Sequence, residues 1–157
     1  MTFGSYDTAL LAVLSTAVVG LASGIVPIVN AELYVLFLGA AAPRPLLPVL
    51  LVVVTLAHMG GKSVAYWAGR NFERLPGGRL RRWIAAGRSR FGERRTLGGA
   101  LLFTSALTGL PPFYALAVGA GVVRYSYPAF LAVGTAGRLL RFGALLFAPA
   151  VARVLTA

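Results

Sequence analysis

A long apolar region near the start of the sequence is interrupted by the eight residues SGIVPIVN at positions 23–30. Glycine and proline end helices, because glycine is too flexible and proline lacks the N–H of an intrahelical hydrogen bond. The break leaves the apolar arms Ala9–Ala22 and Ala31–Ala42, which would be about 21 and 18 Å long as helices. A helix needs about 20 residues to cross the hydrocarbon layer, so neither arm is expected to cross it alone. The pattern predicts a re-entrant helical hairpin with its tip at Pro27.

The same pattern occurs a second time, where the stretch GLPP at positions 109–112 separates the apolar arms Leu97–Thr108 and Phe113–Val122. These arms are also shorter than a membrane crossing. The predicted tip residues of this second hairpin are Gly109, Pro111 and Pro112. A different interpretation stays open, in which Ala9–Ala22 is a slightly short spanning helix and the prolines only kink helices, as they often do in membranes.

Each predicted hairpin is followed by a longer apolar segment, Leu46–Gly69 or Pro128–Ala152, that is long enough to cross. The chain is therefore predicted to be an all-α integral membrane protein made of one membrane domain. Its two repeats would cover about residues 9–69 and 97–152, joined by a basic segment at 70–96. One spanning helix separates the repeats, so the second repeat would be inverted, an arrangement typical of transporters.

The composition supports a membrane location. Hydrophobic residues make up 58% of the 157 residues and charged residues only 12%, whereas soluble domains have about 25% charged residues. This balance excludes an ordinary soluble enzyme and a disordered chain, and the absence of cysteine excludes a disulfide scaffold. One histidine and four acidic residues leave little for hydrolytic catalysis, so we expect no enzymatic activity, no metal site and no cofactor.

The net charge of +11 is concentrated in the segment between Arg70 and Arg95, which holds nine arginines and two glutamates. A basic loop between apolar segments is typical of a cytoplasmic loop that faces anionic lipid headgroups. We therefore expect membrane lipids as partners and do not expect nucleic-acid binding. Arginine provides 14 of the 15 basic residues, which favours a GC-rich bacterial genome and hence a multi-pass protein of the bacterial plasma membrane.

Glu32 is the acidic residue that lies inside an apolar arm. A carboxylate buried in a membrane is unfavourable unless it is paired or protonated. Glu32 follows Asn30, so one interpretation is structural: Asn30 caps a half-helix and Glu32 complements the positive end of its dipole. The functional interpretation makes Glu32 a proton or cation site near the middle of the membrane.

Two arginines, Arg138 and Arg141, lie in the middle of the second spanning segment. They are three residues apart and share one helix face. Arginine stays protonated in proteins, so both charges need a partner. The sequence leaves two alternatives: a salt bridge to Glu32 that leaves one arginine uncompensated, or binding of a phosphate headgroup by both guanidinium groups.

His58, Lys62 and Tyr66 are spaced four residues apart and form a polar stripe on the first spanning helix. Lys62 is expected either to extend to the cytoplasmic interface or to take part in the transport path. His58, the single histidine, is expected to be a packed polar residue. The sequence GKS at 61–63 is not a phosphate-binding loop, because Leu56 occupies the position that needs a glycine.

Four parts of the chain carry a resemblance to a known family. They are Pro27–Gly39 with Glu32, Gly60–Arg70, Gly109–Gly121, and Gly137–Phe142. These features resemble the DedA family of membrane proteins, also called the VTT or SNARE-associated Golgi protein family, of which this chain looks like a compact, divergent member. The resemblance implies paired re-entrant hairpins in inverted repeats and a role in moving lipids across bilayers, including polyprenyl-phosphate carriers.

The function predicted on this basis is a transporter or scramblase for an anionic lipid, either a phospholipid or a polyprenyl-phosphate carrier, with proton coupling left open. Glu32 would be the protonatable group and Arg138 and Arg141 the phosphate partners, with Asn30 and Lys62 beside them. Two alternatives stay open: a membrane structural or homeostasis factor that transports nothing, and a small-ion or proton pathway. Assembly into a homo-oligomer is also left open.

Overall fold

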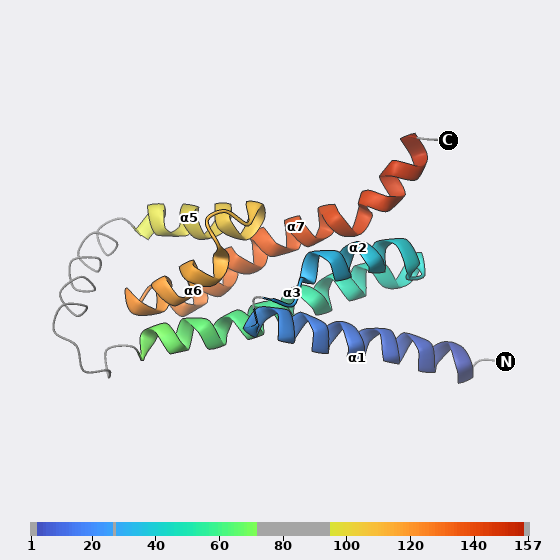
Figure 1. Cartoon of the computed structure of the whole chain (residues 1–157), viewed down its shortest axis with the longest axis horizontal. Coiled ribbons are helices and arrows are strands. Elements are labelled where there is room, and N and C mark those ends of the chain that lie inside the picture. The colour runs from blue at the N-terminus through green and yellow to red at the C-terminus, as the bar shows by residue number, and fades with distance from the viewer. Residues whose placement is uncertain (1–2, 27, 72–94, 156–157) are drawn as a thin grey trace. The chain divides into compact units, whose positions relative to one another are not determined.

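The computed structural model describes residues 3–26, 28–71 and 95–155, and every secondary-structure element in these ranges is a helix (Figure 1). The helices are α1 (Phe3–Ile25), α2 (Ala31–Ala41), the short 3-10 helix η1 (Arg44–Leu46), α3 (Leu47–Arg70), α5 (Arg95–Thr108), α6 (Phe113–Val122) and α7 (Tyr127–Leu155). The predicted tip residue Pro27 and most of the predicted basic segment 70–96 lie outside the described residues.

Three stretches within these helices are long and apolar enough to cross a membrane: Asp7–Ile25, Arg44–Arg70 and Tyr127–Val151. For the described residues, the prediction of an all-helical chain is confirmed, and helices long and apolar enough to span occur where Leu46–Gly69 and Pro128–Ala152 were predicted. Large apolar side chains also point outward, as expected of helices that face hydrocarbon. On α1, for example, Leu11 is 65% exposed and Val18 is 66% exposed.

The first apolar arm is longer than the sequence predicted. We expected Ala9–Ala22 to be too short to cross, but α1 is a single helix of 23 residues, about 34 Å long. The apolar run understates the helix because it begins only after the polar residues Asp7 and Thr8, whereas α1 continues through them to Phe3. At the other end the helix includes Ser23, whose hydroxyl donates a hydrogen bond of 2.8 Å to the Gly20 carbonyl. The expectation that this arm is too short is therefore wrong.

The chain divides into two compact units, which are described separately here. Unit 1 contains residues 1–61 and 139–157, and unit 2 contains residues 62–138. The units differ from the predicted repeats, because α3 and α7 each contribute residues to both.

In unit 1, α2 turns back beside α1 (Figure 1). The Tyr34 hydroxyl of α2 lies 3.0 Å from Thr16 Oγ1 of α1, which fixes the register of the pair. The core forms where α2, α3 and α7 meet, and its fully buried side chains include Val35, Leu50, Val54 and Phe142.

Glycines allow the helices of unit 1 to approach closely. A Cβ atom added to Gly24 of α1 would lie 2.4 Å from the carbonyl oxygen of His58 of α3 and 2.7 Å from Gly61 Cα. A Cβ atom added to Gly39 of α2 would lie 2.0 Å from the carbonyl oxygen of Leu146 of α7. In unit 1, α1 therefore packs on α3, and α2 packs on α7.

In unit 2, α6 turns back beside α5 (Figure 1). Hydroxyl groups at the end of α5 satisfy backbone groups of the turn: Ser105 donates to the Pro111 carbonyl, and Thr108 donates to the Leu110 carbonyl at 3.0 Å. The Leu110–Pro111 peptide bond is cis. The core is aromatic, with the ring of Phe130 stacked 5.1 Å from Tyr66 and 6.0 Å from Phe113.

Glycines also set the helix contacts of unit 2. A Cβ atom added to Gly121 of α6 would lie 1.9 Å from the carbonyl oxygen of Tyr66 of α3. One added to Gly137 of α7 would lie 2.6 Å from Ala106 Cβ of α5. In unit 2, α6 therefore packs on α3, and α5 packs on α7.

Candidate functional site

The predicted site residues form two clusters, one in each unit. We call Asn30, Glu32 and Arg141 of unit 1 the carboxylate cluster. We call Lys62 and Arg138 of unit 2, with the rings of Tyr114 and Phe113, the cation cluster. The predicted tip residues Gly109, Pro111 and Pro112 lie in the turn that leads to the second cluster.

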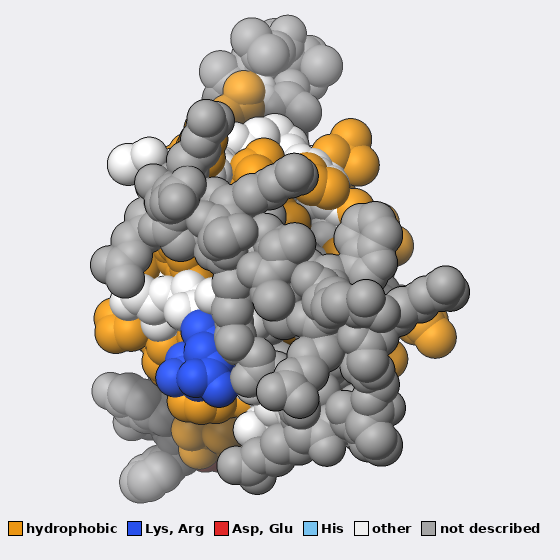
Figure 2. All heavy atoms as spheres, turned by 90° about the vertical axis from the view of Figure 1, so that its left-hand side faces the viewer, with side chains coloured by type: hydrophobic (Ala, Val, Ile, Leu, Met, Phe, Trp, Pro, Cys, Tyr) orange, Lys and Arg blue, Asp and Glu red, His pale blue; other side chains and the backbone are white. Residues whose placement is uncertain are grey.

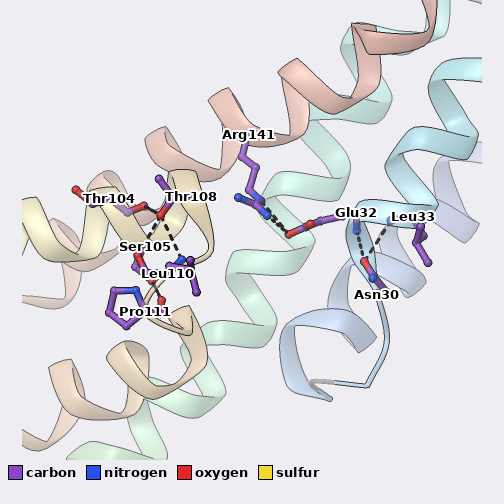
Figure 3. Close-up of polar contacts among 9 residues, drawn as sticks. All are labelled: Asn30, Glu32, Leu33, Thr104, Ser105, Thr108, Leu110, Pro111 and Arg141. Atoms are coloured by element: carbon purple, nitrogen blue, oxygen red, sulfur yellow. Dashed lines mark hydrogen bonds and ion pairs between the residues drawn. The ribbon is translucent and has the colours of Figure 1, made fainter.

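The carboxylate cluster begins with the cap of α2 (Figure 3). Asn30 has an extended backbone, and its Oδ1 atom accepts hydrogen bonds from the N–H groups of Glu32 at 2.9 Å and Leu33 at 3.2 Å. Such a cap satisfies two of the N–H groups that a helix start leaves without intrahelical partners. The prediction that Asn30 caps a half-helix is confirmed.

Glu32 points from the first turn of α2 toward α7, where it meets Arg141 (Figure 3). Arg141 Nε donates to Glu32 Oε1 at 2.8 Å, and the terminal Nη2 atom lies 2.7 Å from the same oxygen. The side chains are 21% exposed for Arg141 and 37% for Glu32. The carboxylate is therefore held both by the helix start and by a guanidinium group, with one edge of the pair open to its surroundings.

His58 lies in the packed interior of unit 1. Its Nδ1 atom is 2.9 Å from Ser23 Oγ, and its ring packs edge-on against Phe142 at 5.4 Å. The Ser23 hydroxyl also lies 2.8 Å from the Gly20 carbonyl, so it links the His58 ring to the backbone of α1. His58 is 4% exposed, which agrees with the prediction of a packed polar residue.

Lys62 opens the cation cluster in unit 2. Its side chain is buried with 4% exposure, and its Nζ atom lies 5.1 Å from the centre of the Tyr114 ring. An ammonium group above an aromatic face is attracted by the negative potential of the ring. The expectation that Lys62 extends to the interface is wrong, because the side chain finds this partner inside the unit.

Arg138 is the second cation of the cluster. It is 7% exposed, and its guanidinium carbon lies 5.1 Å from the centre of the Phe113 ring. The rings that Lys62 and Arg138 contact belong to consecutive residues, Tyr114 and Phe113. Two like charges are therefore held near one another, each against an aromatic ring.

Both rings belong to the start of α6, where Phe113 and Tyr114 are the first two helical residues. The preceding residue, Pro112, provides no side-chain cap. A helix start carries a partial positive charge from its N–H groups. The helix start, Lys62 and Arg138 therefore bring positive charge to the same part of unit 2.

The ion pair between Arg141 and Glu32 is the salt bridge that the sequence analysis gave as one alternative for the two arginines. Arg138, three residues earlier on α7, contacts an aromatic ring within unit 2. The sequence analysis did not single out Phe113 and Tyr114. The available signal was their place directly after two prolines, at the expected start of a helix.

No group of three or more His, Asp or Glu side chains within the described residues is arranged to hold a metal ion. Comparison of the chain with protein-family models, curated proteins and solved structures finds no match. The resemblance to the DedA family therefore stays a prediction from the sequence.

Proposed function

We propose that this protein is a DedA-like transporter or scramblase of the bacterial plasma membrane that moves a lipid with a phosphate headgroup. The observation that carries the proposal is the cation cluster. Lys62 and Arg138 are buried beside the start of α6 in a chain whose described helices are otherwise mostly apolar. A phosphate at this point reduces the repulsion between the cations and accepts hydrogen bonds from them.

The carboxylate cluster supplies a switch in this proposal. Protonation of Glu32 removes the charge that holds Arg141 and so releases the ion pair between α2 and α7. Release allows α2 to move and frees a guanidinium group for the headgroup. The α2 helix has 11 residues and is about 16 Å long. Glu32 at its start would therefore lie near the middle of a hydrocarbon layer of about 30 Å.

The contacts within unit 1 support a re-entrant first hairpin. The bond between Tyr34 and Thr16 fixes a register in which Asp7 and Arg44 lie at the same end of the α1–α2 pair. Both residues are exposed and charged, so an aqueous interface at that end satisfies both of them. A hairpin that enters and leaves on one side has this property.

The helix contacts of the two units support inverted repeats. In the proposed repeat α1 corresponds to α5, α2 to α6 and α3 to α7. The first arm of each hairpin packs on the long helix that follows it, α1 on α3 and α5 on α7. The second arm packs on the other long helix, α2 on α7 and α6 on α3. This exchange of partners is what a two-fold relation between the repeats requires.

The transport proposal is tested with the full chain reconstituted into phosphatidylcholine vesicles that contain fluorescent phosphatidylglycerol. Lys62→Met removes a cation of the cluster with little change of size, and we expect headgroup transfer to fall about tenfold. Lys62→Arg should keep most of the transfer. The matched control is Arg44→Gln, which removes an exposed cation far from the cluster in sequence and should leave transfer unchanged. Equal transfer by wild type and Lys62→Met would overturn the proposal.

The role of Glu32 is tested separately. Glu32→Gln keeps the shape of the side chain and removes the charge, so transfer that depends on Glu32 protonation should be lost. Unchanged transfer would remove Glu32 from the mechanism.

A second candidate function is a structural membrane factor that transports nothing. The observation that favours it is the Glu32–Arg141 ion pair, which joins α2 to α7 within unit 1. In that case Glu32→Gln would lower the thermal stability of the protein in detergent, and no variant would change lipid flux.

A further inference from the structure

Unit 2 contains an apolar cavity between α5 and α6, away from the residues of the cation cluster. The cavity has a volume of about 90 Å³, and its lining includes Leu101 and Leu102 of α5, Leu116 of α6, and Val123 and Tyr125 beyond the end of α6. It is partly open to the surface. Apolar cavities of comparable size do not hold water well but bind small hydrocarbon groups.

Gly119 of α6 also lines this cavity. A Cβ atom added to Gly119 would meet no atom within 4 Å, in contrast to the glycines that set the helix contacts. Within the described residues, no helix contact therefore explains a glycine at this position, and these residues leave space beside it.

Arg124 lies between the cavity residues Val123 and Tyr125. It is exposed, and its backbone has φ 54°, in the left-handed region that favours glycine. The position closes α6, because the N–H groups of Arg124 and Tyr125 bond to the carbonyls of Gly121 at 3.0 Å and Ala120 at 2.8 Å. Glycine is the usual residue at such a helix end. An arginine here is strained, and its exposed position places a positive charge between two residues that line the cavity.

A second cation is tied to the same segment. The Tyr66 hydroxyl donates to the Tyr125 carbonyl at 2.5 Å, and Arg70 donates to that hydroxyl at 3.0 Å. The side of the molecule shown in Figure 2 likewise presents basic side chains next to apolar ones. Apolar space beside exposed positive charge is complementary to one kind of molecule, an anionic lipid.

We propose that the cavity holds the hydrocarbon chain of an anionic phospholipid whose phosphate contacts Arg124. This lipid is resident: it stays bound at the side of unit 2 and is not the lipid that the protein moves. The inference goes beyond the transport proposal and does not depend on it, because the residues of this site are different from those of the two clusters.

The first test uses the full chain in phosphatidylcholine vesicles that contain phosphatidylglycerol with a photoactivatable diazirine on its acyl chain. Cross-links should map to the cavity residues of α5 and α6. Gly119→Leu adds a side chain at a cavity position where the Cβ atom meets no described atom within 4 Å, and it should lower the cross-linking yield about tenfold. The matched control is Gly60→Leu on α3, where the added Cβ would lie 3.7 Å from the flexible end of Leu21. Cross-links that map elsewhere, or a yield that Gly119→Leu leaves unchanged, would overturn the proposal.

The second test asks what Arg124 contributes. Arg124→Gly removes the charge and suits the left-handed backbone, so the variant should be at least as heat-stable as the wild type in detergent. Its cross-linking preference for phosphatidylglycerol over the matching phosphatidylcholine probe should drop by about tenfold. A preference equal to that of the wild type would show that Arg124 does not contact the phosphate.

The two proposals fail separately. The resident lipid should still cross-link in Lys62→Met, whatever that variant does to transfer. Loss of the cross-link in Lys62→Met would mean that the cavity lipid is the transported lipid, and the resident-lipid proposal would then be wrong.

Discussion

Beside the start of α2 in unit 1, the cation Arg141 of α7 pairs with a carboxylate at 2.7 Å. Beside the start of α6 in unit 2, the cations Lys62 and Arg138 lie over aromatic rings at 5.1 Å. The comparison teaches that the two units stabilise a cation beside a helix start in different ways, unit 1 with a carboxylate and unit 2 with aromatic rings.

The N-termini of α2 and α6 also differ between the two units. Asn30 satisfies the N–H groups at the start of α2, whereas α6 begins after Pro112 without a side-chain cap. The turn before α6 is instead held from α5, by Ser105 and Thr108. The uncapped start leaves the positive end of α6 available to an anion, while the capped start of α2 already carries its own carboxylate, Glu32.

The largest expected effect concerns a close helix contact that each unit has within itself. Gly121→Ala would place a Cβ atom 1.9 Å from the Tyr66 carbonyl oxygen, so the helices must separate, at a cost of about 3 kcal/mol. Gly39→Ala in unit 1 meets the Leu146 carbonyl at 2.0 Å and should cost a similar amount. Thermal unfolding in detergent measures both.

The control for this pair is Gly119→Ala, whose Cβ would have open space. It is two residues from Gly121 on the same helix and should change stability by less than about 0.5 kcal/mol. If Gly119→Ala and Gly121→Ala were equally destabilising, the close approach of α6 to α3 would not be the cause.

The next effect concerns the ion pair of unit 1. Glu32→Gln and Arg141→Met should each destabilise the protein, and the double variant should lose less than the sum of the two. We expect a coupling energy of about 1 kcal/mol, reduced from that of a buried pair because Glu32 is 37% exposed. Thermal unfolding of the wild type, the two single variants and the double variant in detergent gives the double-mutant cycle. Simple additivity would show that the pair contributes no interaction energy.

The cap of α2 should give an effect of similar or smaller size. Asn30→Ala leaves the N–H groups of Glu32 and Leu33 without their acceptor and should cost about 1 kcal/mol. Asn30→Asp keeps an acceptor oxygen and should retain most of the stability. The measurement is again thermal unfolding, and equal stability of wild type and Asn30→Ala would contradict the role of the cap.

Local signals in the sequence predicted much of the fold. The arm Phe113–Val122 matches α6 residue for residue, because two prolines fix its start. Asn30 predicted the start of α2 for the same kind of reason, a short-range hydrogen bond. The start of α1 was missed because a count of apolar residues stops at polar ones such as Asp7, whereas the helix continues through them to Phe3.

The partners of the charged residues were harder to predict, because they depend on contacts between residues far apart in the chain. Helical spacing placed Arg138 and Arg141 on one face, but it carries no information about which hairpin arm packs against each of them. The partner of Lys62, Tyr114, is 52 positions later in the sequence, and an aromatic ring has no charge to suggest the pairing. These contacts needed the structure.

The smallest expected effect concerns the contact between Lys62 and the Tyr114 ring in unit 2. Tyr114→Leu removes the aromatic face below Lys62 and should destabilise the protein by about 0.5–1 kcal/mol. Tyr114 is 39% exposed, so the change creates little cavity, and most of the effect is the lost attraction between the cation and the ring. Tyr114→Phe keeps the ring and should behave as the wild type does. The decisive measurement uses the double variant in which Lys62→Met is combined with Tyr114→Leu. If the ring acts through the cation, Tyr114→Leu should be nearly neutral once Lys62 is uncharged, whereas an unchanged loss would mean that the ring only packs and that unit 2 holds its cations by other contacts.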